Sequence, residues 1–223
     1  MPAVLRLSDA AETAIGLADL GQIGGGEPQS GCLLVVGYED SAAAVAAQRD
    51  RVAAVLRDTG GQPLGDQPGE RWAAGRYAAP YLRDALLDAG AFAETLETAT
   101  FWSNLTRLYA AVRDGLTSSL TEQGAPPLVL CHVSHVYPAG ASLYFTVVCA
   151  QRDDPVSQWR QAKTAASEAI IATGGTISHH HGVGTDHRDW LAGELGPLGI
   201  EILRAVKERL DPAGILNPGV LVP

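Results

Sequence analysis

The sequence has few of the residues that mark a disulfide scaffold or a nucleic-acid-binding protein. Its three cysteines, Cys32, Cys131 and Cys149, share no short spacing, which argues against a disulfide framework and favours a reducing cytosol. All three lie in apolar runs, where cysteine usually behaves as a small buried hydrophobe. The chain holds 16 Lys and Arg against 25 Asp and Glu, so it lacks the basic patch that nucleic acids or anionic membranes require.

Long apolar runs and nucleotide-binding loops are missing as well. The longest apolar runs, such as Leu143–Ala150, have the length of a strand and are too short to cross a bilayer. The N-terminus shows no basic stretch followed by an apolar core, so we expect no signal peptide and a cytoplasmic protein. No Gly-x-Gly-x-x-Gly motif or phosphate loop is present, which argues against a nucleotide-binding fold.

The sequence does contain a regular succession of strand-like and helix-like segments. Apolar runs predict strands at Cys32–Val36, Ala91–Phe101, Leu128–Tyr137 and Leu143–Ala150. Apolar spacing and capping residues predict helices at 40–60, 80–87, 103–124, 154–173 and 197–210. Gly24–Pro28 is a clear breaker, and a Gly/Pro-rich loop is expected around Pro63 and Pro68.

The order of these segments predicts the fold class. The two strands joined by Pro138–Gly140 must be antiparallel, because their connection is too short for a crossover. Helices that alternate with single strands must lie on a face of the sheet. We therefore expect an α+β fold, in which helices cover an antiparallel sheet with ferredoxin-like ordering.

The most distinctive segment is Thr176–Gly184, in which His179, His180 and His181 are adjacent and glycines stand on both sides. Histidine moves protons near neutral pH, and glycine permits a close approach of the backbone to a ligand. An affinity tag would lie at a terminus and run longer. A solvated, histidine-rich loop and a functional loop both fit the residues.

A zinc site is another interpretation of the histidines, together with His132 and His135. These two residues are three apart on a predicted strand, so they should point to opposite faces. Adjacent histidines on an extended segment should diverge as well. The spacing therefore argues against a simple metal site.

Three further residues could contact a substrate. Tyr144 follows the predicted hairpin, where an aromatic side chain is more commonly a sheet or core residue. Arg83 and Arg6 each stand among apolar residues. Each is either a surface arginine or a clamp for phosphate or carboxylate.

In combination, these segments resemble a known family. Val4–Asp9, Tyr81–Asp84, Gly140–Phe145 and Ser178–Gly184 occur in the order found in alkyldihydroxyacetonephosphate synthases, which are FAD-linked oxidases of the vanillyl-alcohol-oxidase type. The ending Leu210–Gly219 resembles the closing signature of FAD-linked oxidases generally. The resemblance covers nearly the whole chain and implies a C-terminal substrate (cap) portion without its flavin-anchoring domain.

The resemblance also implies a role for each candidate residue. The catalytic residues, which would transfer protons at the substrate carbon, are Tyr144, His180 and His181. The substrate would be held by Arg83, Arg6, His179 and His132. FAD would be bound mainly by a domain absent from this chain, with contacts from His181 and Asn217. We expect Arg83, Tyr144 and His180 or His181 to converge on one face of the sheet.

The sequence departs from the related D-2-hydroxyacid dehydrogenases at positions that resemble metal ligands. His132 is retained, but Tyr144 stands where those enzymes have a second histidine, and His180 where they have a glutamate. Losing a carboxylate and an imidazole should weaken a divalent-metal site. We therefore expect no metal, and chemistry of the synthase or oxidase kind.

The implied activity is the exchange of an acyl for an alkyl group on dihydroxyacetone phosphate in ether-lipid synthesis. Its partners would be a small phosphorylated or carboxylated substrate, a fatty alcohol and the FAD-binding domain. One alternative is an FAD-linked oxidoreductase of a 2-hydroxyacid or alcohol, and another is a non-catalytic binding module that lacks its flavin partner. The chain alone would be inactive.

The resemblance divides the chain into two parts. Residues 1–175 would form the substrate domain, and residues 176–223 the histidine loop, the last helix and a tail that docks on the flavin domain. A homo-oligomer and a peripheral position at a membrane are further expectations.

Overall fold

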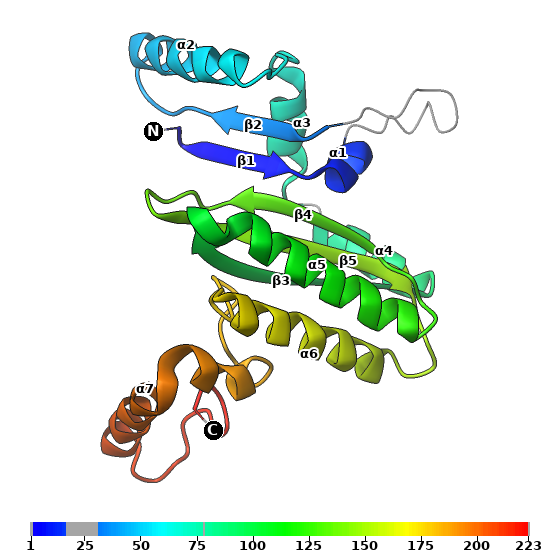
Figure 1. Cartoon of the computed structure of the whole chain (residues 1–223), viewed down its shortest axis with the longest axis vertical. Helices are drawn as coiled ribbons and strands as arrows, with labels where there is room; N and C mark the ends of the chain where they lie inside the picture. Colours follow the sequence, from blue (N-terminus) through cyan, green and yellow to red (C-terminus); the bar gives the residue numbers. More distant parts are fainter. Residues whose placement is uncertain (1, 17–30, 78, 223) are drawn as a thin grey trace.

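Five strands form one sheet in the computed structural model, which describes residues 2–16, 31–77 and 79–222. They are β1 (Val4–Ser8), β2 (Leu33–Gly37), β3 (Ala91–Phe101), β4 (Leu128–Ser134) and β5 (Gly140–Ala150). Their order is β2-β1-β4-β5-β3, and every neighbouring pair is antiparallel (Figure 1). The predicted α+β fold with an antiparallel sheet is confirmed.

The helices of the described residues surround this sheet unevenly. They are α1 (Ala10–Gly16), α2 (Ala42–Asp58), α3 (Gln67–Gly75), α4 (Ala79–Asp88), α5 (Leu105–Glu122), α6 (Pro155–Thr173) and α7 (Arg188–Leu210), with a 3-10 turn at Trp102–Asn104. Helices α5 and α6 lie side by side, with α5 across β3, β4 and β5, while α4 lies beside β3 (Figure 1). One face of the three-stranded part of the sheet is therefore covered by a helical layer.

The core lies between this helical layer and the sheet. Alternate residues of β5 point into it and are almost fully buried, namely Leu143, Phe145 and Val147. Helix α5 contributes four side chains with no solvent exposure at a spacing of four residues, Leu108, Val112, Leu116 and Leu120. This spacing places them on one helix face, as packing against a sheet requires.

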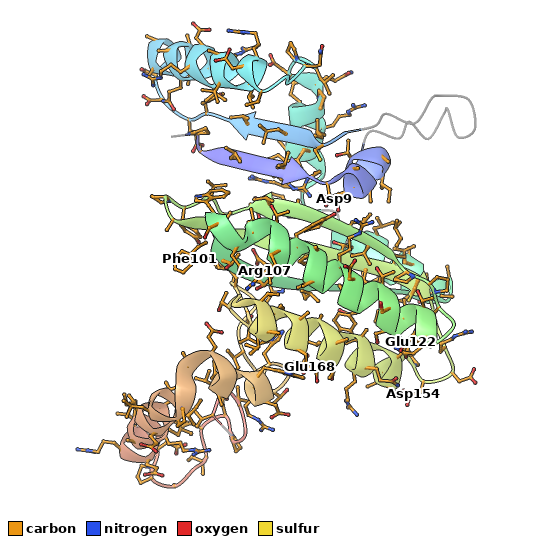
Figure 2. The ribbon with its side chains drawn as sticks, viewed as in Figure 1. Asp9, Phe101, Arg107, Glu122, Asp154 and Glu168 are labelled. Carbon is orange, nitrogen blue, oxygen red and sulfur yellow. The ribbon has the colours of Figure 1, made fainter. Side chains whose placement is uncertain are left out.

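Helix α6 has a defined beginning and end. The Asp154 side chain accepts a hydrogen bond from the Ser157 backbone N–H, and Gly174 ends the helix in the left-handed region with φ 75°. Figure 2 shows Asp154 at the start of α6, near Glu122 at the end of α5.

The unit β3-α5-β4-β5-α6 has the ferredoxin-like order that the sequence predicts, with β5 between β3 and β4. In the ferredoxin-like motif a fourth strand lies beside the strand that corresponds to β3. Here the histidine segment, Thr176–Gly184, takes that position. The backbone N–H groups of Thr176 and His179 donate to the carbonyls of Ala99 and Glu97, at 2.9 and 3.1 Å. The segment thus covers the edge of the sheet and is held against it.

Several elements differ from the sequence-based expectations. Strand β1 and helix α1 were not predicted, and α3 lies within the expected Gly/Pro-rich loop because Pro68 is compatible with the first turn of a helix. Helix α7 begins at Arg188 rather than at Pro197. Gly196, at φ 72° and ψ 170°, interrupts it, and Pro197 starts its second segment. The breaker predicted at Gly24–Pro28 lies outside the described residues.

The cysteines only partly match their expected burial. Cys131 and Cys149 are buried, and burial raises the pKa of both thiols. Cys32 is exposed, because it precedes β2 instead of belonging to it. Across the described ranges of the chain, no helix is long and apolar enough to span a membrane.

Candidate active site

A row of polar side chains crosses the sheet on the face opposite to the helical layer. In the strand register, His132 of β4 pairs with Tyr144 of β5, and Tyr144 pairs with Glu97 of β3. Residues paired directly across strands share a face, and Phe145, next to Tyr144, points into the core on the other side. The alternation along each strand therefore places an imidazole, a phenol and a carboxylate side by side.

These residues lie in a groove of about 720 Å³. Besides the row itself, the groove is lined by His135, Tyr137, His180 and His181, by the β1 segment that includes Arg6, and by Trp72 of α3. His180 and His181 are exposed, whereas His132 and Tyr144 are half-buried. The structure thus brings together Arg6, His132, Tyr144, His180 and His181 from the predicted set.

Arg6 is already paired at one end of the row. Its Nη2 lies 2.9 Å from Oε1 of Glu12 and 2.9 Å from Nδ1 of His132, and its Nη1 donates to Ser8 Oγ at 2.8 Å. Burial tends to raise the pKa of Glu12, but the hydrogen bond and charge of His132, together with Arg6, outweigh it and lower this pKa. Part of the positive charge of Arg6 is therefore already compensated before a substrate anion binds.

Tyr144 lies between two imidazoles. Its ring stacks on His132, with centroids 4.9 Å apart and planes 13° apart, and meets His181 edge to face at 5.3 Å. The ring of Tyr144 therefore has an imidazole on each side, and imidazole is a group that can take or return a proton near neutral pH. This placement is compatible with the acid–base role that the resemblance implies for Tyr144.

Glu97 was missed by the sequence reasoning. Its side chain is only 3% exposed, yet three imidazole nitrogens lie within 4.0 Å of its carboxylate oxygens, those of His135, His179 and His181. The shortest distance is 3.1 Å, from Oε1 to Nδ1 of His179. The sequence did offer one signal for Glu97, which is a carboxylate in a strand of apolar and Thr residues. A charge buried in such a strand needs a partner, so it indicates a polar contact.

The expected divergence of the histidines is wrong. His135 lies just after β4 with φ 42°, which turns its side chain toward the groove that His132 also lines. His180 has φ 60°, and its ring stacks on that of His179 with centroids 4.1 Å apart. Left-handed backbone conformations at both positions break the alternation of an extended chain.

The clustering brings three potential metal ligands, one carboxylate and two imidazoles, close to one point. One ligand atom from each of Glu97, His179 and His180 lies within 4.8 Å of the others, a set that could hold a metal ion. Burial lowers the pKa of nearby His135, and the adjacent His180, His179 and His132 lower it further against the effect of Glu97. The sequence-based expectation of no metal stays a prediction.

Two predicted site residues lie elsewhere. The Arg83 guanidinium donates to the Ala93 carbonyl and to Glu94, and it does not line the groove, so the expected convergence fails for this residue. Asn217 forms a turn in the tail, where its carbonyl accepts from the Val220 N–H. The tail is anchored by Arg188, whose Nη1 donates to the Gly219 carbonyl at 2.7 Å.

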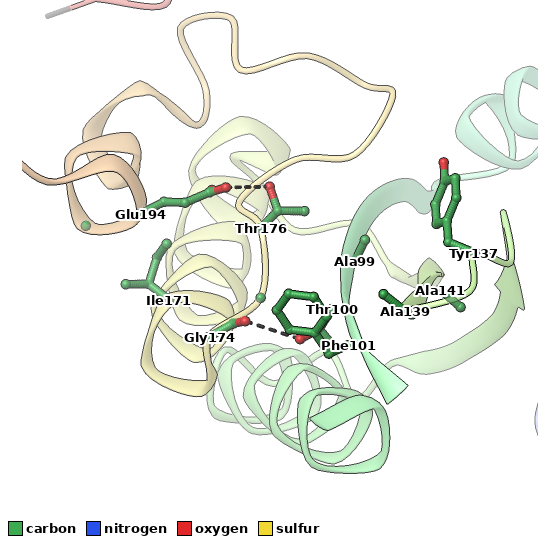
Figure 3. A pocket seen from close by; sticks show the side chains of 13 residues that line it. Ala99, Thr100, Phe101, Tyr137, Ala139, Ala141, Ile171, Gly174, Thr176 and Glu194 are labelled. Carbon is green, nitrogen blue, oxygen red and sulfur yellow. Dashed lines mark hydrogen bonds between the residues drawn. The ribbon is translucent and has the colours of Figure 1, made fainter. Parts of the chain in front are cut away.

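A second hollow of about 590 Å³ lies beyond the end of β3 (Figure 3). It is lined by Phe101, Ile171 and several alanines and glycines, with Tyr137 on one side and Glu194 on another. Glu194 accepts hydrogen bonds from Thr176 Oγ1 and from the Ile177 N–H, at 2.8 and 2.7 Å. Tyr137 lines both this hollow and the groove.

The fold and the groove define an α+β domain with one packed face and one face that carries acid–base groups. The chain belongs to the family described as FAD linked oxidases, C-terminal domain, whose model matches residues 1–221. It is 34% identical over 193 residues to an alkyldihydroxyacetonephosphate synthase of Dictyostelium discoideum, covering 86% of this chain and 32% of that protein.

Two further comparisons agree. An alkyldihydroxyacetonephosphate synthase of Trypanosoma brucei brucei is 33% identical over 192 residues, covering 86% of this chain and 31% of that protein. A solved structure of an alkyldihydroxyacetonephosphate synthase has a TM-score of 0.67 and 25% identity, covering 98% of this chain and 39% of that one. The chain spans about a third of the length of the curated relatives that it matches.

Proposed function

We propose that this chain is the substrate-binding and catalytic portion of an FAD-dependent enzyme of the alkyldihydroxyacetonephosphate synthase type. Such an enzyme exchanges an acyl for an alkyl group on dihydroxyacetone phosphate, with a fatty alcohol as the second substrate. The observation that carries the proposal is the paired row of His132, Tyr144 and Glu97, which shares one groove with Arg6 and His181. The relatives' names give the product class, an alkyldihydroxyacetonephosphate, and the exchange with a fatty alcohol is what the resemblance implies.

The groove fits one part of the implied FAD. The exposed imidazoles of His180 and His181 and the Tyr144 hydroxyl suit the nitrogens and carbonyls of the flavin ring. The pyrophosphate would need a glycine-rich loop at a helix N-terminus, and the sequence has no such motif. His181 and Asn217 would contact FAD, and the FAD-binding domain would hold the rest. When bound, FAD would supply the carbon-centred chemistry that side chains cannot.

The chain's own residues would bind the substrate and move protons. Arg6, His132 and His179 would orient a small phosphorylated or carboxylated substrate. Tyr144, with His180 and His181 beside it, would transfer the proton at the substrate carbon. Arg83 is paired with Glu94. It would bind the substrate's anionic group only if this pair opened and the anion took the place of the Glu94 carboxylate.

An exposed apolar stripe supports a docking role for the part after residue 175. Leu198, Ile202, Val206 and Leu210 recur every four residues along α7, and each is at least 50% exposed. Several large apolar side chains exposed in a row on one helix indicate a contact surface. We propose that residues 176–223 face the FAD-binding domain. A homo-oligomer, a cytoplasmic location and contact with a membrane remain predictions.

The test uses the complete flavoprotein that contains this chain. We expect it to form alkyldihydroxyacetone phosphate from an acyl ester of dihydroxyacetone phosphate and a long-chain alcohol. Tyr144→Phe should lower kcat by about 10²–10⁴-fold, the usual contribution of a positioned acid–base group, without lowering the unfolding temperature. Tyr77→Phe is the matched control, because Tyr77 is 74% exposed and does not line the groove.

Other results would select the alternatives. Reduction of FAD by a 2-hydroxyacid or an alcohol, with no alkyl product, would favour an oxidoreductase. Full activity in the Tyr144→Phe enzyme would contradict the assigned role of this residue. Binding of the substrate without any FAD-dependent turnover would favour a binding module.

A further inference from the structure

A second tyrosine is linked to the histidine segment by hydrogen bonds. The Tyr137 hydroxyl lies 3.2 Å from Nε2 of His179, and the other ring nitrogen, Nδ1, lies 3.1 Å from Oε1 of Glu97. The three side chains come from the loop after β4, from the histidine segment and from β3. Together they form a continuous chain of carboxylate, imidazole and hydroxyl.

The chemistry of the three groups fixes the direction of both hydrogen bonds. An ionised carboxylate only accepts, so Nδ1 of His179 carries the hydrogen and donates it to Glu97. In a neutral imidazole, the other nitrogen then has a free lone pair, so Nε2 accepts from the Tyr137 hydroxyl. The same order of groups activates the hydroxyl nucleophile of serine hydrolases.

The surroundings hold this arrangement in place. The His179 N–H donates to the Glu97 carbonyl at 3.1 Å, which fixes the imidazole beside β3. The Tyr137 N–H donates to the Gly140 carbonyl at 2.8 Å, and Trp102 Nε1 donates to the Tyr137 carbonyl at 3.2 Å. The backbone of Tyr137 is therefore held beside the histidine segment, and its hydroxyl is directed by the contact with His179.

Glu97 and the imidazole of His179 meet where little water is present. The Glu97 side chain is 3% exposed and that of His179 is 14% exposed, so little water screens the charge between them. The hydrogen bond from Nδ1 of His179 to the carboxylate of Glu97 is electrostatically stronger in this medium of low dielectric constant than it would be in water.

We propose that Tyr137 is an acid–base residue, activated by His179 and positioned through it by Glu97. The Tyr137 hydroxyl proton moves to Nε2 of His179, while the hydrogen on Nδ1 stays on Nδ1 and continues to be donated to Glu97. The phenolate oxygen then takes one proton from the bound molecule, and the reverse steps restore the starting state. No electrons are transferred, so these steps need no oxidant or reductant.

The position of Tyr137 determines which of the two spaces it adjoins. It is 45% exposed and lines both the groove and the second hollow, whereas Tyr144 lines only the groove. Tyr137 therefore lies where the two spaces adjoin, and its hydroxyl is on the side of His179. The use of this proton on a substrate rests on the proposed function, but the activated hydroxyl is a property of this chain alone.

The test measures the reactivity of the Tyr137 hydroxyl in this chain without FAD or substrate. An aryl sulfonyl fluoride is added near pH 7.5, and the labelling rate of each tyrosine is followed by peptide mass spectrometry. Tyr137 should react at least about tenfold faster than the more exposed Tyr77, because an adjacent base activates its hydroxyl. Glu97→Gln and His179→Asn should each bring the ratio of the two rates down to about one.

Matched controls separate activation from loss of structure. Glu94→Gln changes an acid on the same strand and should leave the labelling ratio unchanged. Nitrogen-15 NMR of the imidazoles should show hydrogen on Nδ1 of His179 and its loss from Nδ1 in Glu97→Gln. Circular dichroism confirms that each variant is folded, and His179→Asn still gives the answer if Glu97→Gln does not fold.

Two results would overturn the proposal. One is equal labelling of Tyr137 and Tyr77, or a ratio that Glu97→Gln and His179→Asn both leave unchanged. The other is stoichiometric binding of Zn²⁺ that requires Glu97 and blocks labelling of Tyr137, which would assign the cluster to a metal. Neither result would contradict the proposed FAD-dependent reaction at Tyr144, which the product assay tests separately.

Discussion

The two faces of the strands β3, β4 and β5 differ in what they contribute to the protein. One face, with Phe145 and Leu143, is closed by α5 and α6 and is almost fully buried. The other, with Tyr144 one residue away, carries ionisable side chains around an open groove. Because side chains alternate along a strand, one segment can supply a packed core and a reactive surface. The difference predicts that the packed face sets the stability and the open face sets the activity.

The strongest test of this division changes two neighbours on β5. Phe145→Ala should lower the free energy of unfolding by about 3–5 kcal/mol, because it leaves a cavity in a core with no room to collapse. Tyr144→Ala removes a similar ring from the half-buried open face and should cost clearly less. Urea unfolding followed by circular dichroism measures both. Equal losses would contradict the division.

A polar residue on the packed side gives a second test. Gln158 of α6 is 2% exposed, and its side chain accepts from the Arg152 N–H and donates to the Ala150 carbonyl, both at 3.0 Å. Gln158→Ala should cost about 2–3 kcal/mol of unfolding free energy, because it leaves two backbone groups without their partner. Gln161→Ala, on the exposed side of the same helix, should cost less than about 0.5 kcal/mol. A similar effect of both changes would show that the buried amide is dispensable.

The next test compares two acids that each bind an arginine. Glu12→Gln removes the charge shared by Arg6 and His132 in a partly buried setting, and should cost about 1–2 kcal/mol of unfolding free energy. Glu94→Gln breaks the more exposed pair with Arg83 and should cost less than about 1 kcal/mol. Thermal unfolding of the two variants measures the difference. A larger loss in Glu94→Gln would contradict the role assigned to burial.

Local patterns in the sequence predicted the packed part of the fold. The strand at Ala91–Phe101 and the helices near 105–122 and 155–173 lie where apolar spacing and capping residues placed them, and so does the more exposed helix near 42–58. Strand β1 is as long as the predicted β2, and it was missed because it is defined by its pairing with β2 and β4. Strand pairing between segments far apart leaves no local signal.

The candidate site was predicted less completely, for a physical reason. Tyr144 and the three adjacent histidines were predicted as site residues from the family motif. Glu97 and Tyr137 were identified only from the structure, in which both contact His179. The backbone turn at His135, with φ 42°, also reversed the expectation that it points away from His132. A single sequence shows residue types and spacing, whereas catalysis depends on which distant residues meet.

The smallest expected effect is the pH dependence of stability, and it also separates the two regions. Burial lowers the pKa of His187, and nearby Lys163 lowers it further. Burial also lowers the pKa of His135 on the open face. Below their usual pKa of about 6.5, the unfolded chain binds protons that the folded chain resists. Stability should therefore be complete above about pH 6.5 and decline as the pH falls toward 5.

The His187→Gln and His135→Gln variants assign this slope to its source. His187 is buried where α7 begins, whereas His135 is exposed, so His187→Gln should remove more of the decline between pH 6.5 and 5. Glutamine can keep the hydrogen bond that His187 makes to the Gly182 carbonyl. Urea unfolding at several pH values measures each slope. If His135→Gln had the larger effect, the open face, and not the packed region beside α6, would limit stability in acid.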